Sequence, residues 1–281
     1  MRKKLKPIVV IGFFLTFFAI IFISGVYGNR ATAGKETTIT QSNTNPTSIE
    51  TIPSSSYYIT NALEMKPIID VSAWQRPSEI DYDTLSQNIS GAIVRIQSGS
   101  HTKNENTATD ENGLDKAFDT HIKEFQARNV PVAVYAYVTG NSIDSMKEEA
   151  RSFYEAANKY NPTFYWLDVE EHTMDDMNGG VEAFRQELES LGAKNIGIYV
   201  GTYFMEDHSI NVDKFDAIWI PTYGVDSGYY NAAPSTDLDY DLHQYTSRGY
   251  VNGFENYLDL NIITTLKDPN EVYRKLFTTP E

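Results

Sequence analysis

Hydrophobic residues follow a changing pattern along the chain. From Pro67 onward, short apolar runs alternate with segments in which apolar residues recur at every third or fourth position. The short runs are typical of buried strands, and we predict eight of them: residues 67–71, 92–97, 131–138, 163–170, 196–203, 217–223, 241–245 and 257–262. The periodic segments predict helices, the second with Ser142 as its N-cap: residues 113–128, 142–160 and 180–191.

The order of these elements predicts the fold class. Strands that alternate with helices form a parallel sheet, and about eight such strands close into a barrel. Long helices are absent between the last three predicted strands. We therefore expect an α/β fold, an irregular TIM-like (β/α) barrel with fewer helices in its last third. In such barrels the chemistry takes place at the carboxyl ends of the strands.

The N-terminal segment has the pattern of a membrane anchor. Residues 8–26 carry no charge, and four basic residues precede them: Arg2, Lys3, Lys4 and Lys6. A helix of this length spans the roughly 30 Å hydrocarbon core of a bilayer, and a basic cluster stays in the cytoplasm. We predict a cytoplasmic tail at 1–7 and an uncleaved anchor at 8–27, which places the following domain on the extracellular face of the cell membrane. The alternative is secretion after cleavage of a signal peptide near Ala31-Thr32-Ala33, although the apolar core of such peptides is usually about 7–15 residues long.

A polar stretch separates the predicted anchor from the predicted barrel. Residues 28–65 are rich in Ser, Thr and Asn and show no helical or strand period. This composition predicts a flexible linker. The barrel then occupies residues 66–265, and residues 266–281 are left as a C-terminal tail.

Composition excludes several classes of function. The chain has no cysteine, and its net charge of −15 repels the phosphates of nucleic acids. Its five histidines lack the His-Glu-x-x-His spacing of zinc hydrolases. No nucleophile elbow, phosphate loop or dinucleotide fingerprint is present. We therefore expect no metal, no cofactor and no nucleic-acid partner.

The run from Thr163 to Glu170 carries the candidate chemistry. Alternate side chains of a strand share a face, so Trp166, Asp168 and Glu170 point the same way. Paired carboxyl groups suit the cleavage of a glycosidic bond, because one gives a proton to the leaving oxygen and the other stabilises positive charge at the sugar carbon. Taken alone, the pair is better explained as a capping acid (Asp168) beside a solvated one (Glu170), because short motifs recur by chance.

Two further acids lie within predicted strands. Asp70 falls in the first strand and Asp259 in the eighth, and an acid in an apolar run is costly to bury unless it is paired or hydrogen-bonded. Each can also serve as a turn or capping residue. If all four carboxyl groups meet in one pocket, their pKa values move apart, and one group stays protonated near neutral pH.

A set of short motifs follows in order between about Lys66 and Ile263. The motifs are Ile69-Asp70-Val71-Ser72 with Trp74-Gln75, Ile93-Val94-Arg95, Asp115 with Phe118, Tyr135, Leu167-Asp168-Val169-Glu170, Gly197-Ile198-Tyr199, Trp219-Ile220 with Tyr223, Gln244-Tyr245-Thr246 and Leu258-Asp259-Leu260-Asn261. Together they resemble the family 25 glycoside hydrolases, which are lysozymes that act as N-acetylmuramidases.

The resemblance implies a flattened barrel with an acidic groove. Such an enzyme hydrolyses the β-1,4 bond between N-acetylmuramic acid and N-acetylglucosamine in peptidoglycan. Glu170 matches the general acid/base and Asp168 its partner carboxylate, while Asp70 and Asp259 match acids that line the same site. We expect the glycan strand to contact seven further side chains: Trp74, Arg95, Tyr135, Tyr137, Trp219, Tyr223 and Gln244.

Two roles remain open for Asp168. It can attack the sugar carbon directly, or it can orient the N-acetyl oxygen of the substrate for that attack. We favour the second role, with retention of configuration, because residues two apart on a strand lie about 6.5–7 Å apart, whereas nucleophile pairs lie about 5–5.5 Å apart. The alternatives to a muramidase are an inactive peptidoglycan-binding barrel of a cell-envelope assembly and a chitinase-like N-acetylglucosaminidase. A tethered muramidase can serve a secretion or conjugation channel, cell division, or spore or phage processes, and the sequence leaves this choice open.

Overall fold

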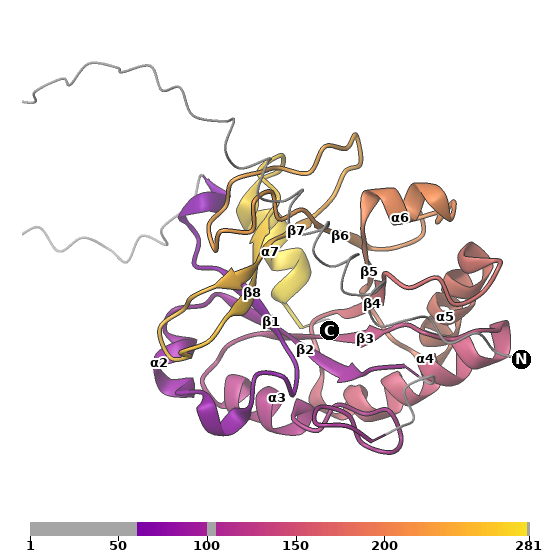
Figure 1. Ribbon diagram of the computed structural model, residues 1–281, viewed down its shortest axis with the longest axis horizontal. Helices are drawn as coiled ribbons and strands as arrows, with labels where there is room; N and C mark the ends of the chain where they lie inside the picture. The colour runs from indigo at the N-terminus through magenta and orange to yellow at the C-terminus, as the bar shows by residue number, and fades with distance from the viewer. Residues whose placement is uncertain (1–60, 100–104, 280–281) are drawn as a thin grey trace, which may run out of the picture. The chain divides into compact units, whose positions relative to one another are not determined.

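The computed structural model describes residues 61–99 and 105–279, which contain a closed barrel of eight strands (Figure 1). Neighbouring strands from β1 to β7 are parallel, and β8 is antiparallel to both β7 and β1. The strands follow one another around the barrel in chain order: β1 (Ile68–Val71), β2 (Gly91–Gln97), β3 (Val132–Tyr137), β4 (Tyr165–Val169), β5 (Ile196–Val200), β6 (Ala217–Pro221), β7 (Leu242–Gly249) and β8 (Leu258–Ile263). The predicted barrel is confirmed.

Helices are longest between β2 and β5. The described residues contain six α-helices: α2 (Tyr82–Ser86), α3 (Phe118–Ala127), α4 (Ile143–Ala157), α5 (Met177–Leu191), α6 (Thr202–Asp207) and α7 (Pro269–Phe277). They also contain three short 3-10 helices: η1 (Ala62–Glu64), η2 (Pro77–Glu79) and η4 (Asn158–Tyr160). The three predicted helices correspond to α3, α4 and α5, and no helix lies between β6 and β7 or between β7 and β8.

Local capping residues decide where the long helices begin and end. Ser142 caps α4 and forms a capping box with Ser145. The Asp176 carboxylate accepts a hydrogen bond from the Gly179 amide (2.8 Å), which starts α5 three residues before the predicted position. Gly192 ends the same helix at a φ of 97°, a left-handed conformation that glycine adopts without steric cost.

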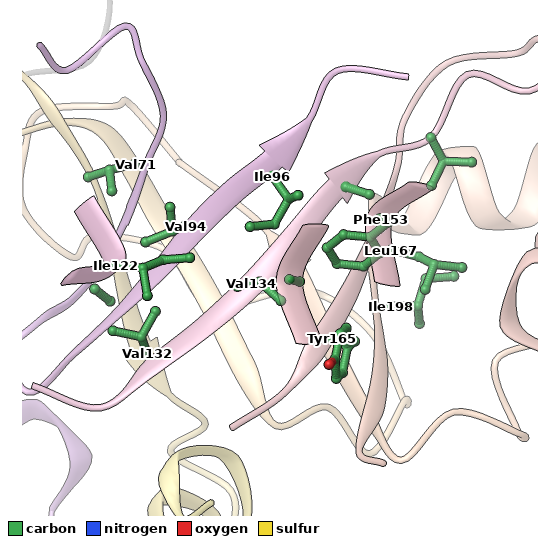
Figure 2. Packing of buried hydrophobic residues seen from close by; sticks show 14 of the residues in the cluster. Val71, Val94, Ile96, Ile122, Val132, Val134, Phe153, Tyr165, Leu167 and Ile198 are labelled. Atoms are coloured by element: carbon green, nitrogen blue, oxygen red, sulfur yellow. The ribbon is translucent and has the colours of Figure 1, made fainter. Parts of the chain in front are cut away.

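The strands bury side chains on both faces. Their outward side chains, such as Val94, Val134 and Leu167, share one buried cluster with Ile122 of α3 and Phe153 of α4 (Figure 2). This cluster is the larger core, and it holds the helices against the outside of the barrel. Its members alternate along each strand with the side chains that point into the barrel.

The inward side chains form a second core inside the barrel. Phe164 and Trp166 stack within it at a ring separation of 4.8 Å, and Trp219 meets Trp166 edge to face. Gly197 of β5 leaves room for this packing, because a Cβ atom there would lie 2.4 Å from the Trp166 ring. The filled interior leaves the carboxyl ends of the strands to hold polar groups.

The stretch 266–281, which we expected to be a tail, contains helix α7. Asp268 caps this helix, Pro269 occupies its first turn, and Val272, Leu276 and Phe277 are buried in the inner core. The Tyr273 hydroxyl donates a hydrogen bond to the Ser90 carbonyl oxygen (2.6 Å), just before β2 begins. The segment is therefore part of the barrel domain, because its apolar stripe is buried against the amino-terminal end of β2.

The predicted N-terminal tail, the anchor and all of the predicted linker except its last five residues lie outside the described residues. Across residues 61–99 and 105–279, none of the helices has the length and apolar character that crossing a bilayer requires. The anchor prediction therefore rests on the sequence of residues 1–27 alone.

Candidate active site

Four acids from three strands line one cavity at the carboxyl ends of the parallel strands. Asp70 belongs to β1, Asp168 to β4 and Asp259 to β8, and Glu170 follows β4 directly. Asp70 and Asp259 are direct partners across the antiparallel β1–β8 pair. The cavity has a volume of about 170 Å³ and is lined by nine residues: Asp70, Tyr135, Asp168, Glu170, Tyr199, Trp219, Tyr223, Gln244 and Asp259.

The register of the barrel brings these side chains to one level. Asp168 pairs with Tyr137 on one side and Tyr199 on the other, and Tyr199 pairs with Trp219. Along β4, Trp166 belongs to the inner core, whereas Leu167 and its outward neighbours belong to the outer core. This alternation agrees with the faces that we predict for the run 163–170.

A chain of hydrogen bonds across the barrel holds Asp70. Its Oδ2 accepts hydrogen bonds from Gln244 Nε2 (2.9 Å) and Asn261 Nδ2 (2.8 Å). Gln244 Oε1 in turn accepts from the hydroxyl groups of Tyr199 (2.9 Å) and Tyr223 (2.6 Å). We expected Gln244 to contact the substrate. Both ends of its amide are engaged within the protein, so this side chain positions Asp70.

Burial raises the pKa of all four carboxyl groups, and repulsion from nearby acids adds to this rise for Asp168, Glu170 and Asp259. Burial, followed by repulsion from Asp70, raises the pKa of Asp259 to about 8. Burial raises the pKa of Asp70 only to about 6, because the hydrogen bonds from Asn261 and Gln244 favour its ionised form. Burial and nearby acids also raise the pKa of Asp168, well above its ordinary value, and that of Glu170. The cluster therefore keeps a proton near neutral pH, whereas Asp70, with a pKa of about 6, is mostly ionised there.

Trp219, one of the predicted substrate-contacting residues, is too buried to offer a ring face to a sugar. It is 2% exposed, and the Trp166 and Tyr199 rings both meet it edge to face. Its indole Nε1 nevertheless finds no hydrogen-bond partner among the described residues, and neither does Asp168 Oδ1. Both residues line the cavity. Trp219 Nε1 can therefore donate a hydrogen bond to a polar ligand, and Asp168 Oδ1 can accept one.

Three of the predicted substrate-contacting residues do not line the acid cavity. Arg95 is buried and donates to Asp115 Oδ2 through Nε (3.0 Å), with its Nη2 2.9 Å from the same oxygen. Trp74 is 60% exposed on the loop after β1. The Tyr137 hydroxyl donates to Glu171 Oε2 (3.2 Å), one residue beyond Glu170. The other predicted residues all line the cavity.

Three residues that shape the site belong to the motifs found in the sequence but not to the predicted site residues. Tyr199 lines the cavity, and Asn261 anchors Asp70. Asp115 accepts from the Ala73 amide as well as from Arg95 (2.9 and 3.0 Å), and so fixes the loop after β1. The signal for Asn261 is its position two residues after Asp259, which puts both side chains on one face of β8.

The cavity offers the chemistry of carboxyl and hydroxyl groups. In the described part of the chain, no group of three or more histidine, aspartate or glutamate side chains is suited to hold a metal ion. Tyr135, Tyr199 and Tyr223 instead surround the acids. The arrangement can transfer a proton and stabilise a developing positive charge, which are the two requirements of glycosidic cleavage.

Comparison with known proteins identifies the family. The model of the glycosyl hydrolases family 25 matches residues 69–254, a range that begins in β1 and includes three of the four acids. The chain belongs to glycosyl hydrolase family 25. No curated protein matches it in sequence.

Several solved structures share the fold. GHIP of Streptococcus pneumoniae, described as a glycosyl hydrolase 25 and a virulence factor that participates in host cell invasion, is 61% identical, with 78% of this chain and 96% of that chain covered and a TM-score of 0.75. The catalytic domain of the endolysin Ply40 from bacteriophage P40 of Listeria monocytogenes is 25% identical, with coverage of 74% and 97% and a TM-score of 0.64. The autolysin LytC of S. pneumoniae, solved with a synthetic peptidoglycan ligand, is 19% identical, with coverage of 74% and 50% and a TM-score of 0.58, and shows the fold alone.

Proposed function

We propose that this glycoside hydrolase cleaves the β-1,4 bond between N-acetylmuramic acid and N-acetylglucosamine in peptidoglycan. The observation that carries the proposal is the meeting of Asp70, Asp168, Glu170 and Asp259 in one cavity of a family 25 barrel. Bringing four acids together in one cavity is costly, because their charges repel one another and three of them lie within strands. A site that only binds neutral sugars does not require that arrangement, which argues against an inactive peptidoglycan-binding barrel.

Glu170 is the proposed general acid and base. The residue as a whole is exposed at the end of β4, so a polymer can reach it. Its carboxyl group is partly buried, and this burial together with repulsion from Asp70 raises its pKa. Glu170 gives its proton to the glycosidic oxygen as the bond from that oxygen to the sugar carbon breaks. It then takes a proton from the water molecule that completes hydrolysis.

Asp168 is the proposed partner that positions the substrate's own acetamido group. Its buried Oδ1, which has no protein partner among the described residues, can accept a hydrogen bond from the acetamido N–H. The acetamido oxygen then bonds to the sugar carbon as the leaving oxygen departs, and water later breaks that bond. Two displacements at one carbon retain its configuration.

Asp70 and Asp259 complete the proposed site. Asp70 is held by two amide donors on one oxygen, which favours its ionised form and stabilises positive charge at the sugar carbon. Asp259, whose pKa burial raises to about 8, stays protonated beside it at neutral pH. Tyr135 and Tyr223 line the cavity and contact the sugar, and the buried Trp219 contributes its N–H edge.

Analysis of the products separates this activity from that of a chitinase-like N-acetylglucosaminidase. The full-length protein is incubated with purified peptidoglycan, and the released fragments are reduced and analysed by mass spectrometry. A muramidase leaves N-acetylmuramic acid at every new reducing end. In a sample observed by NMR before reduction, the β-anomer appears first if configuration is retained. Reducing ends that carry N-acetylglucosamine would contradict the proposed bond specificity.

We also propose that residues 8–27 anchor the enzyme in the cell membrane with its barrel outside. The support is the uncharged run behind four basic residues and the polar stretch that follows. A tethered muramidase of this kind suits local opening of the wall for a secretion or conjugation assembly. Recovery of the intact chain in the membrane fraction is expected, whereas a shorter protein that begins near Ala33 in the medium would favour secretion.

A further inference from the structure

A second cavity lies beside the loops that follow β1 and β7. It has a volume of about 510 Å³ and is lined by Glu79, Asp81, Thr84 and residues 250–255. We call it the rim cavity. Pockets that hold small ligands have volumes of about 300–1,000 Å³, so the rim cavity is large enough for a sugar residue.

The two walls of the rim cavity extend from strands that bear catalytic acids. One wall follows β1, which carries Asp70, and the other leads into β8, which carries Asp259. Ile80 and Phe254 form an isolated antiparallel bridge between the walls, and the Asp81 amide donates to the Gly253 carbonyl (2.8 Å). The cavity is therefore preformed and tied to the elements that hold the acids.

A group of three side chains, Tyr250, Tyr257 and Arg248, extends from the rim cavity toward the start of β8. The Tyr250 and Tyr257 rings lie 4.8 Å apart, and the Arg248 guanidinium lies 5.2 Å from the centre of the Tyr257 ring. Tyr257 precedes Asp259 by two positions, and Leu258 between them is buried in the outer core. Tyr257 therefore lies on the same face of the chain as Asp259, about 7 Å further along the backbone.

Both tyrosines of this group are exposed to solvent. Tyr250 is 65% exposed and Tyr257 is 45% exposed, although aromatic side chains usually bury most of their surface. Tyr250 itself lines the rim cavity. Because Tyr250 contacts Tyr257, and Tyr257 in turn contacts Arg248, the Tyr250 ring is positioned before anything binds.

Some carboxylates of the rim cavity are already hydrogen-bonded within the protein, and others can accept hydrogen bonds from a ligand. The Asp81 carboxylate accepts from the Thr84 amide (3.1 Å) and hydroxyl (2.6 Å), which caps α2. Glu79 makes one exposed ion pair with Arg76 (3.2 Å). Glu255 makes no hydrogen bond or ion pair within residues 61–99 and 105–279. Two carboxylates therefore remain that can accept hydrogen bonds from hydroxyl groups.

We propose that the rim cavity binds a further amino-sugar residue of the glycan strand, at a distance from the bond that is cleaved. The apolar face of the sugar packs on Tyr250, and its hydroxyl groups donate to Glu79 and Glu255. The proposal rests on the proposed function, because it assigns a second contact to the same polymer. Its consequence is a preference for long glycan strands over short ones.

The test compares two peptide-free substrates that the acid cavity treats alike. The full-length protein cleaves either long glycan strands freed of their peptides or a purified tetrasaccharide of the same repeat, and the ratio of the two kcat/KM values is measured. Tyr250→Ala is expected to lower this ratio about tenfold, the factor that corresponds to 1.4 kcal/mol. Tyr250→Trp should restore the ratio, and Glu255→Gln should lower it to a smaller extent.

Tyr203→Ala is the matched control, because Tyr203 is an 82% exposed tyrosine on α6 that lines neither cavity. Its ratio should equal that of the unsubstituted protein. A ratio that Tyr250→Ala and Glu255→Gln both leave unchanged would overturn the proposal, whether or not both kcat/KM values fall. If the unsubstituted protein cleaves neither substrate, the proposed function itself is wrong.

Discussion

Gln244→Leu removes the side chain that joins β1, β5, β7 and the loop after β6 around Asp70. Leucine has a similar volume but lacks the Nε2 donor to Asp70 (2.9 Å) and the Oε1 acceptor for the hydroxyl groups of Tyr199 and Tyr223. The Asn261 donor remains. Asp70 therefore loses one of the two amide hydrogen bonds that oppose the effect of its burial.

The size of the effect follows from the strength of that bond. A hydrogen bond to a charged group contributes about 1.5–3 kcal/mol, and about 1.4 kcal/mol corresponds to one pH unit. The pKa of Asp70 is about 6 in the intact protein. If Asp70 must be ionised for catalysis, the acid limb of the pH–activity profile should move from near pH 6 to a value about one to two pH units higher. The buried Tyr199 hydroxyl also loses its acceptor, which should lower stability by about 1–3 kcal/mol.

The assay is kcat/KM on purified peptidoglycan from pH 4 to pH 9 at constant ionic strength, with thermal unfolding followed in parallel. Tyr223→Phe is the control, because it removes one hydroxyl donor to Gln244 and keeps the hydrogen bond from Gln244 to Asp70. Its acid limb should stay in place. An acid limb that Gln244→Leu does not move, in a variant that remains folded, would refute the assignment of Gln244 as the residue that positions Asp70.

Three further predictions concern packing and charge. Gly197→Ala places a Cβ 2.4 Å from the Trp166 ring and should lower the unfolding free energy by about 1–3 kcal/mol in denaturant titrations. Asp115→Ala leaves the buried Arg95 guanidinium without its partner and should cost about 3–5 kcal/mol in the same assay. Because the folded-state pKa of Asp259 is raised from 3.8 to about 8, the folded protein binds that proton more tightly than the unfolded chain. This contribution to stability is complete below about pH 4 and is lost as the pH rises through 8, so Asp259→Asn should lessen the fall in melting temperature between pH 5 and pH 8.

The directions of the catalytic side chains could be predicted because a strand has a period of two. The run 163–170 alternates in sequence, and the structure places Asp168 and Glu170 at the cavity and Leu167 in the outer core. Parallel strands bring their carboxyl ends to one edge, so Asp70 could be placed beside them. Asp259 joins them from an antiparallel strand that begins at this edge.

Partners of these side chains could not be predicted, because contacts between distant residues leave no local pattern. The hydrogen bond from Gln244 to Asp70 joins residues 174 positions apart, and only the closed barrel brings them together. Arg95 looked like a residue that binds substrate, but the loop before α3 supplies Asp115 as its partner. Helix α7 was missed because nine residues give only about two turns of periodicity.

The most direct test of the central claim is the hydrolysis of purified peptidoglycan by Glu170→Gln. Glutamine keeps the size of the side chain and cannot donate the proton, so new reducing ends should fall by about 10²–10⁴-fold. The circular dichroism spectrum and the melting temperature should show an intact fold, because Glu170 is exposed at the end of β4. Release of reducing ends at the rate of the unsubstituted enzyme would contradict the assignment of Glu170 as the proton donor, and with it this account of the site.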